Sequence, residues 1–101
     1  MLRIRYPLAA LLAIGLLGST PAQAADPVRG QELFRQHCLN CHAPGQPMPG
    51  APDFALGQTL FQPDGVLLEK IRDGVNAMPG YRGILDNAMI LDVIAYMRTL
   101  Q

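Results

Sequence analysis

The sequence predicts a small all-α domain, and three observations support this fold class. Apolar residues from Met89 to Leu100 recur at steps of three and four, which is typical of an amphipathic helix. Two pairs, Asp26-Pro27 and Pro63-Asp64, combine an acid with a proline in the way that helix starts do. No segment alternates apolar and polar residues as a half-buried strand would.

The first predicted helix runs from Pro27 to about Cys38 and carries Leu33 and Phe34 as apolar residues. Gly30 lies one turn before Phe34. A glycine inside a helix costs about 1 kcal/mol relative to alanine, so its presence predicts a close crossing with another helix.

Residues 43–52 hold four prolines and two glycines in ten positions, which excludes a regular helix or a central strand. Apolar anchors are expected after this loop, at Phe54, Leu56, Leu60 and Phe61. A second helix is predicted from Pro63-Asp64 to a stop at Gly74, with an apolar face made of Val66, Leu67 and Ile71. Residues 75–83 are predicted to form a loop, and Asp86 to cap the last helix, whose apolar stripe is Met89, Ile90, Val93, Ile94, Met97 and Leu100.

The N-terminus has the pattern of a secretory signal peptide, residues 1–24. Arg3 and Arg5 form a basic start, residues 8–18 are apolar, and Ala22-Gln23-Ala24 is an A-x-A cleavage site. The apolar run is far shorter than the roughly 20 residues that a membrane span needs. The domain is therefore expected to comprise residues 25–101, to be periplasmic, and to have no stable membrane insertion after cleavage.

The mature chain is expected to be one small monomeric domain near the lower size limit for a self-sufficient core. Removing Arg3 and Arg5 from the eight basic residues leaves six against eight acids, a net charge of −2. This balance argues against nucleic acid or an anionic membrane surface as a partner.

The run Cys38-Leu39-Asn40-Cys41-His42 is the attachment signature of a c-type haem. Two thiols at this spacing can add to the two vinyl groups of the porphyrin, and the adjacent histidine can then bind the iron. Such a covalent haem, one per chain, would provide a large apolar surface that stabilises a small core.

Three other interpretations of this motif remain open. A zinc site usually needs four ligands, and His37 adjoins Cys38, so a Cys2His2 site is geometrically poor. A thioredoxin-like dithiol would follow a strand, and no strand-like run precedes Cys38. A structural disulfide between cysteines three residues apart would close a very small loop and add little stability.

The mature chain resembles the small class I, His/Met-ligated bacterial c-type cytochromes. The resemblance covers the helix with Gly30 and Phe34 that leads into the C-x-x-C-H run, the proline-rich loop, residues 71–74, Met78-Pro79 with Tyr81, and Ala95-Tyr96. It implies that the first and last helices cross near Gly30, with Phe34 against Val93 and Tyr96. It also implies that Met78, in the loop of residues 75–83 (the methionine loop), supplies the sixth iron ligand. A further implication is that a proline carbonyl, which Pro52 could provide, accepts a hydrogen bond from the ligand histidine and holds its ring.

The choice of sixth ligand also follows from chain length. Met48 is only six residues after His42, a span of at most about 20 Å, with two prolines to accommodate. Met78 lies beyond the second predicted helix and can approach from the opposite face. Met89 and Met97 are expected to fill the core, and His37 to be a solvated helix residue. Arg72 and Arg82 could face haem propionates or be ordinary surface charges.

The predicted function is a periplasmic one-electron carrier that exchanges electrons with a dehydrogenase, reductase or oxidase and is not an enzyme. A Met/His pair saturates the iron and leaves no site for a substrate. The alternatives are a subunit or maturation partner of a larger oxidoreductase and, with less support, a haem enzyme or gas sensor with an open sixth position. No His/Arg pair of the peroxidase type is evident.

Overall fold

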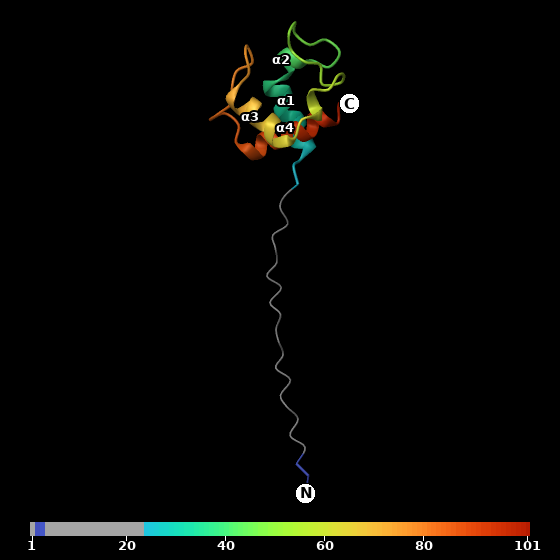
Figure 1. Ribbon diagram of the computed structural model, residues 1–101, viewed down its shortest axis with the longest axis vertical. Coiled ribbons are helices and arrows are strands. Elements are labelled where there is room, and N and C mark those ends of the chain that lie inside the picture. The colour runs from blue at the N-terminus through green and yellow to red at the C-terminus, as the bar shows by residue number, and fades with distance from the viewer. Residues whose placement is uncertain (1, 4–23) are drawn as a thin grey trace.

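The computed structural model describes residues 2–3 and 24–101, and within them every element is a helix (Figure 1). The elements are α1 (Pro27–His37), α2 (Leu39–His42), a 3-10 turn η1 (Thr59–Phe61), α3 (Asp64–Asp73) and α4 (Asn87–Arg98). The described part has no strand and only an isolated bridge between Val75 and Met78. The all-α prediction is therefore confirmed, while the predicted signal peptide lies almost wholly outside the described residues.

The helix boundaries follow the capping residues that the sequence contains. The Asp26 carboxylate accepts hydrogen bonds from Val28 N at 2.9 Å and Arg29 N at 3.3 Å, and Asp86 accepts from Met89 N at 2.8 Å. Such caps satisfy backbone donors that have no partner within the helix. Gly74 ends α3 with a φ of 85°, in the left-handed region that favours glycine. The predicted helix starts and the Gly74 stop are confirmed.

Helices α1 and α4 pack directly against each other, and Gly30 marks their closest approach. A Cβ atom at this position would lie 1.8 Å from the carbonyl oxygen of Asp92 and 3.0 Å from Val93 N. Phe34, one turn later, meets Tyr96 edge to face with ring centroids 5.3 Å apart. The close helix crossing predicted from Gly30 is confirmed, and so is its location against the middle of α4.

Most of the predicted apolar faces are buried, with some exceptions. Buried core side chains include Leu33, Phe34, Phe54, Leu60, Leu67, Ile71, Ile90, Val93, Ile94 and Met97. Two predicted anchors are wrong: Leu56 is 70% exposed and Phe61 is 72% exposed. Leu56 lies in irregular backbone and Phe61 ends the three-residue η1, so neither belongs to a helix long enough for a period to select a buried face. Val66 is 41% exposed, because it lies beside rather than within the face of α3 that meets the core.

The C-terminal end of α4 holds the start of α3 in place through one arginine. The Arg98 guanidinium donates to the carbonyl oxygens of Leu60 and Gln62 and to Asp64 Oδ1, the last at 2.6 Å. One side chain thus connects η1, α3 and α4. This arrangement fixes the short middle part of the fold that forms one wall of the functional site.

Candidate functional site

A cavity of about 540 Å³ lies between the C-x-x-C-H run, the loop after α2, α3, the loop after α3, and α4. Its walls are mainly apolar. They include the predicted residues Cys38, Cys41, His42, Pro52 and Met78, together with Phe54, Leu67, Ile71, Val93 and Met97. The fold therefore brings residues more than 30 positions apart to the walls of one cavity.

Cys38 and Cys41 lie at this cavity as free cysteines, not bonded to each other. Burial, followed by the neighbouring Cys41, raises the pKa of the Cys38 thiol to about 11. Catalytic redox dithiols depend on a lowered thiol pKa, which favours the reactive thiolate. The environment of Cys38 therefore argues against the dithiol interpretation. Among the described residues, no group of three or more His, Cys, Asp or Glu side chains is arranged to hold a metal ion.

His42 is held rigidly in the cavity wall. Its side chain is buried, and its ring stacks on Phe54 with centroids 4.6 Å apart and an interplanar angle of 24°. His42 Nδ1 lies 3.1 Å from the carbonyl oxygen of Pro52. A carbonyl oxygen can only accept, so this contact places the ring proton on Nδ1 and leaves the lone pair of Nε2 free to bind a metal.

Met78 reaches the cavity from the loop that follows α3. The bridge fixes this loop: Val75 N donates to Met78 O at 3.1 Å, and Met78 N donates to Val75 O at 2.9 Å. Gly74 and Gly80 pack so tightly that a Cβ atom on either would lie 2.8 Å from backbone atoms. Met78 is half-buried against the core and lines the cavity. Backbone contacts therefore hold the loop, and with it Met78, in one position.

Met48 also lines the cavity but lies in a different environment. Its side chain is 53% exposed, and Met48 N donates to Cys41 O at 2.8 Å. This backbone hydrogen bond keeps Met48 next to the attachment motif. The Met48 backbone therefore lies beside Cys41, whereas the Met78 backbone is held by the loop after α3.

Tyr81 connects the methionine loop to the attachment motif. Its hydroxyl donates to the carbonyl oxygen of His37 at 2.8 Å, and its ring meets the His37 ring edge to face at 5.9 Å. Burial, followed by Cys38 and Cys41, raises the pKa of Tyr81, so the hydroxyl stays protonated and can donate. His37 is half-buried and lines the cavity, so the expectation of a solvated helix residue is wrong.

Removing this hydroxyl should loosen the loop without changing the donor atoms of the site. We expect Tyr81→Phe to lower the free energy of unfolding by about 1 kcal/mol, the usual net value of one hydrogen bond. Denaturant unfolding measures this difference, and the visible spectrum should stay unchanged. A stability equal to that of the unaltered protein would show that the Tyr81 contact contributes nothing.

Neither Arg72 nor Arg82 lines the cavity. Both pair with Asp73, Arg72 Nε at 3.2 Å and Arg82 at 2.7 Å, and their hydrogen bonds hold the pKa of Asp73 below its ordinary value. Both guanidinium groups thus pair with one carboxylate outside the cavity. The cavity wall instead carries Lys70, whose ammonium donates to Gln62 Oε1 at 2.6 Å. The sequence predicts Phe54 as an apolar anchor but does not indicate that it stacks on His42. It also does not indicate the pairing of Lys70 with Gln62 at the cavity wall.

The residues around this cavity fit a covalently attached haem. The walls are mainly apolar, both cysteines of the attachment motif line the space, and His42 has a free Nε2. Met78 lines the same cavity from a separate loop, and its side chain carries a thioether sulfur. These are a nitrogen and a sulfur donor of the kind found in cytochromes c, which gives the cavity a donor set that suits haem iron.

Comparisons with known proteins point to the same class. Residues 25–97 match the family model described as "Cytochrome C oxidase, cbb3-type, subunit III". The chain is 34% identical over 84 residues to cytochrome c6 of Nostoc sp., covering 78% of this chain and 75% of that protein. It is 36% identical over 92 residues to cytochrome c6 of Thermosynechococcus vestitus, covering 85% and 82%.

A solved structure and a larger protein extend this relationship. The crystal structure of cytochrome c6 from the diatom Phaeodactylum tricornutum matches with a TM-score of 0.64 at 27% identity, covering 74% of this chain and 93% of that chain. Dihydro-heme d1 dehydrogenase of Pseudomonas aeruginosa is 36% identical over 89 residues, which are 85% of this chain but 18% of that protein. The chain therefore belongs to the matched family and, with its cytochrome c6 relatives, to the class I c-type cytochromes, which carry single electrons on a covalently attached haem c.

Proposed function

We propose that this cytochrome is a free periplasmic one-electron carrier with thioether bonds at Cys38 and Cys41 and axial ligands His42 and Met78. The observation that carries the proposal is one mainly apolar cavity that His42, with Nε2 free, and Met78 line from separate segments. A histidine and a methionine together saturate haem iron and leave no position for a substrate. Carrier function without catalysis follows from that ligand set.

The haem supplies the one-electron couple of its iron, and the protein supplies rigid binding and a largely dry pocket. The Pro52 carbonyl and the Phe54 ring hold the His42 ring in one orientation. The Val75–Met78 bridge holds the methionine loop. Rigid ligands favour electron transfer, because little of the structure must rearrange when the charge on the iron changes.

The proposed location rests on the signal sequence, with cleavage after Ala24. Within the described residues, no helix is long and apolar enough to cross a membrane. The mature protein is proposed to be a monomer that docks briefly on a dehydrogenase, reductase or oxidase. Its small net charge of −2 would favour partners through local contacts around the exposed edge of the cofactor rather than through strong steering.

Carbon monoxide tests the closed coordination of the iron. At neutral pH, the reduced protein should show no change in its visible spectrum on exposure to carbon monoxide, while it exchanges electrons rapidly with an electrode. Rapid carbon monoxide binding, or steady turnover of peroxide, would instead support the haem enzyme or gas sensor.

One observation favours a second candidate, a haem-bearing subunit of a larger oxidoreductase. The matched family is described as an oxidase subunit, and one relative contains a similar segment as 18% of a longer dehydrogenase. Size-exclusion chromatography of a periplasmic extract, followed at the haem absorbance, separates the two candidates. A peak at the mass of one mature chain supports the free carrier, and elution only with a larger protein supports the subunit.

A further inference from the structure

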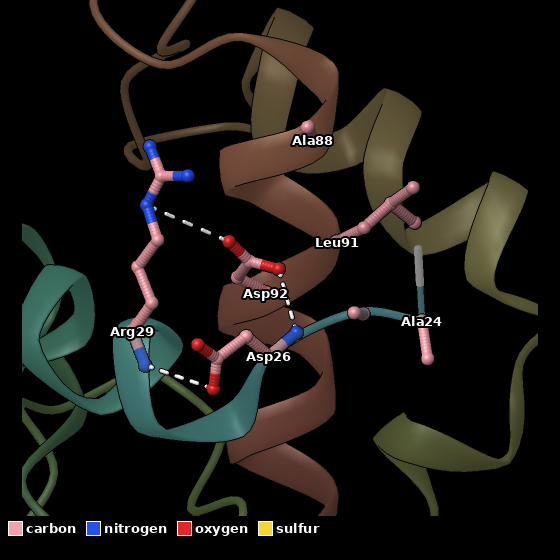
Figure 2. Close-up of a pocket in the computed structure, with 7 residues that line it drawn as sticks. Ala24, Asp26, Arg29, Ala88, Leu91 and Asp92 are labelled. Atoms are coloured by element: carbon pink, nitrogen blue, oxygen red, sulfur yellow. Dashed lines mark hydrogen bonds and ion pairs between the residues drawn. The ribbon is translucent and has the colours of Figure 1, made fainter. Parts of the chain in front are cut away.

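A second, smaller cavity lies at the start of α1, apart from the haem site. It has a volume of about 220 Å³ and is lined by Ala24, Ala25, Asp26, Arg29, Ala88, Leu91 and Asp92 (Figure 2). Its walls thus combine the first residues of the expected mature chain with one face of α4. None of these residues lines the haem cavity.

The carboxylate of Asp92 is the buried charge of this cavity. Asp92 is 7% exposed, and its Oδ1 accepts a hydrogen bond from Asp26 N at 2.8 Å (Figure 2). Its Oδ2 faces Arg29 Nε at 3.7 Å, which is too long for a hydrogen bond, and the Arg29 side chain is 51% exposed. A buried carboxylate is costly unless charges or donors compensate for it. Asp92 therefore has capacity for another cationic group.

The expected cleavage site lies directly beside this carboxylate. Ala25 and Asp26 are adjacent in the chain, so their backbone nitrogens are at most about 3.6 Å apart, the length of one extended residue. Since Asp26 N is 2.8 Å from Asp92 Oδ1, the Ala25 nitrogen lies within about 6.4 Å of that oxygen. Hydrolysis of the Ala24–Ala25 bond by water leaves a carboxylate on Ala24, which departs with the leader, and an ammonium group on Ala25.

We propose that the cavity at Asp92 is a binding site for the α-ammonium group that signal-peptide removal creates at Ala25. This inference rests on the proposed cleavage after Ala24. A positive charge at the start of a helix is opposed by the helix dipole. The Asp92 carboxylate offsets this unfavourable effect by attracting the ammonium group. It comes from a different helix, and because it is shielded from water, its attraction for a positive charge is stronger than that of an exposed carboxylate. Processing thereby ties the start of α1 to α4, beside the crossing at Gly30.

The test compares four forms of the haem-loaded periplasmic protein, with the normal or an extended N-terminus and with Asp92 or Asn at position 92. The equilibrium constant for folding is measured for each form. The second N-terminus carries an added Gly-Ser between Ala24 and Ala25, which moves the ammonium group two residues away. With Asp92 present, this extension should lower the equilibrium constant for folding by about two- to fivefold, the range of a modest ion pair. With Asp92→Asn, which keeps an oxygen acceptor for Asp26 N, the extension should change that constant by less than about 1.5-fold.

Asp86→Asn is the matched control, because it removes an acid from the start of the same helix while asparagine still serves as a cap. The extension should destabilise this variant as much as it does the unaltered protein. If Asp92→Asn does not accumulate, Arg29→Gln replaces it: removing the competing cation should enlarge the effect of the extension.

Intact mass spectrometry separates the two possible failures. A mature chain that starts elsewhere than Ala25 refutes the proposed processing and, with it, the site. A correct start with no effect of the extension, or with an equal effect whether or not Asp92 is replaced, refutes the ammonium site alone.

Discussion

Replacing Gly30 with alanine should abolish stable folding or reduce it to a small fraction of normal. The added Cβ would lie 1.8 Å from the Asp92 carbonyl oxygen and 2.4 Å from its carbon, both of which are backbone atoms. No side-chain rotation relieves such a contact, so α1 and α4 must separate and give up packing between Phe34 and Tyr96. We expect a loss of more than about 3 kcal/mol, the upper end of overpacking effects, against a total stability of about 5–15 kcal/mol.

Gly65→Ala is the matched control for this substitution. Gly65 lies in α3, where an added Cβ atom would meet no other part of the protein within 4 Å, and its φ is not positive. Alanine should therefore stabilise the protein by about 0.5–1 kcal/mol through helix propensity alone. The yield of haem-loaded protein and its denaturation midpoint measure both effects. Near-normal stability of Gly30→Ala would contradict the close crossing of α1 and α4.

Local signals explain why much of the fold could be predicted from the sequence. Asp26, Asp86 and Gly74 act within one helical turn, so their effects on helix boundaries do not depend on the rest of the fold. The Cys38–His42 run is likewise a local spacing. Gly30 is a longer-range case, and its role could be inferred because a glycine in the middle of a helix has a cost that only a close contact offsets.

Contacts between distant segments explain what the sequence could not predict. Leu56 and Phe61 are apolar, but the segment between α2 and α3 contains only the three-residue η1, so it has no period from which a buried face can be inferred. Arg98 meets Leu60 and Asp64 across more than 30 residues, and no pattern in the sequence links them. The same holds for the parts of the site that lie in irregular backbone, such as the stacking of Phe54 on His42.

Two arginines near the methionine loop, Arg72 and Arg82, pair with the same carboxylate, which could not be predicted from their positive charge alone. Arg72 lies near the end of α3 and Arg82 lies in the loop itself. Both bind Asp73, whose pKa they lower, so Asp73 stays ionised and pairs with both guanidinium groups. The cation at the cavity wall is Lys70, which shares α3 with Arg72 but lies on the helical face that meets Gln62.

Replacing Met78 should change the iron site more than any other methionine substitution. We expect Met78→Ala to abolish the weak near-infrared sulfur-to-iron band of the oxidised protein. The reduction potential should fall by more than about 0.1 V, a part of the roughly 0.8 V range that axial ligands span. The reduced variant should also bind carbon monoxide, because the position opposite His42 would then be open.

Met48→Ala provides the comparison, because Met48 lines the same cavity but is 53% exposed and is tied by its backbone to Cys41. The near-infrared band, the potential and the absence of carbon monoxide binding should all persist in this variant. The reverse pattern, with the band lost in Met48→Ala and kept in Met78→Ala, would mean that the six residues after His42 can round the haem edge. In that case the Val75–Met78 bridge would serve only to close the cavity wall, and the argument from chain length would be wrong.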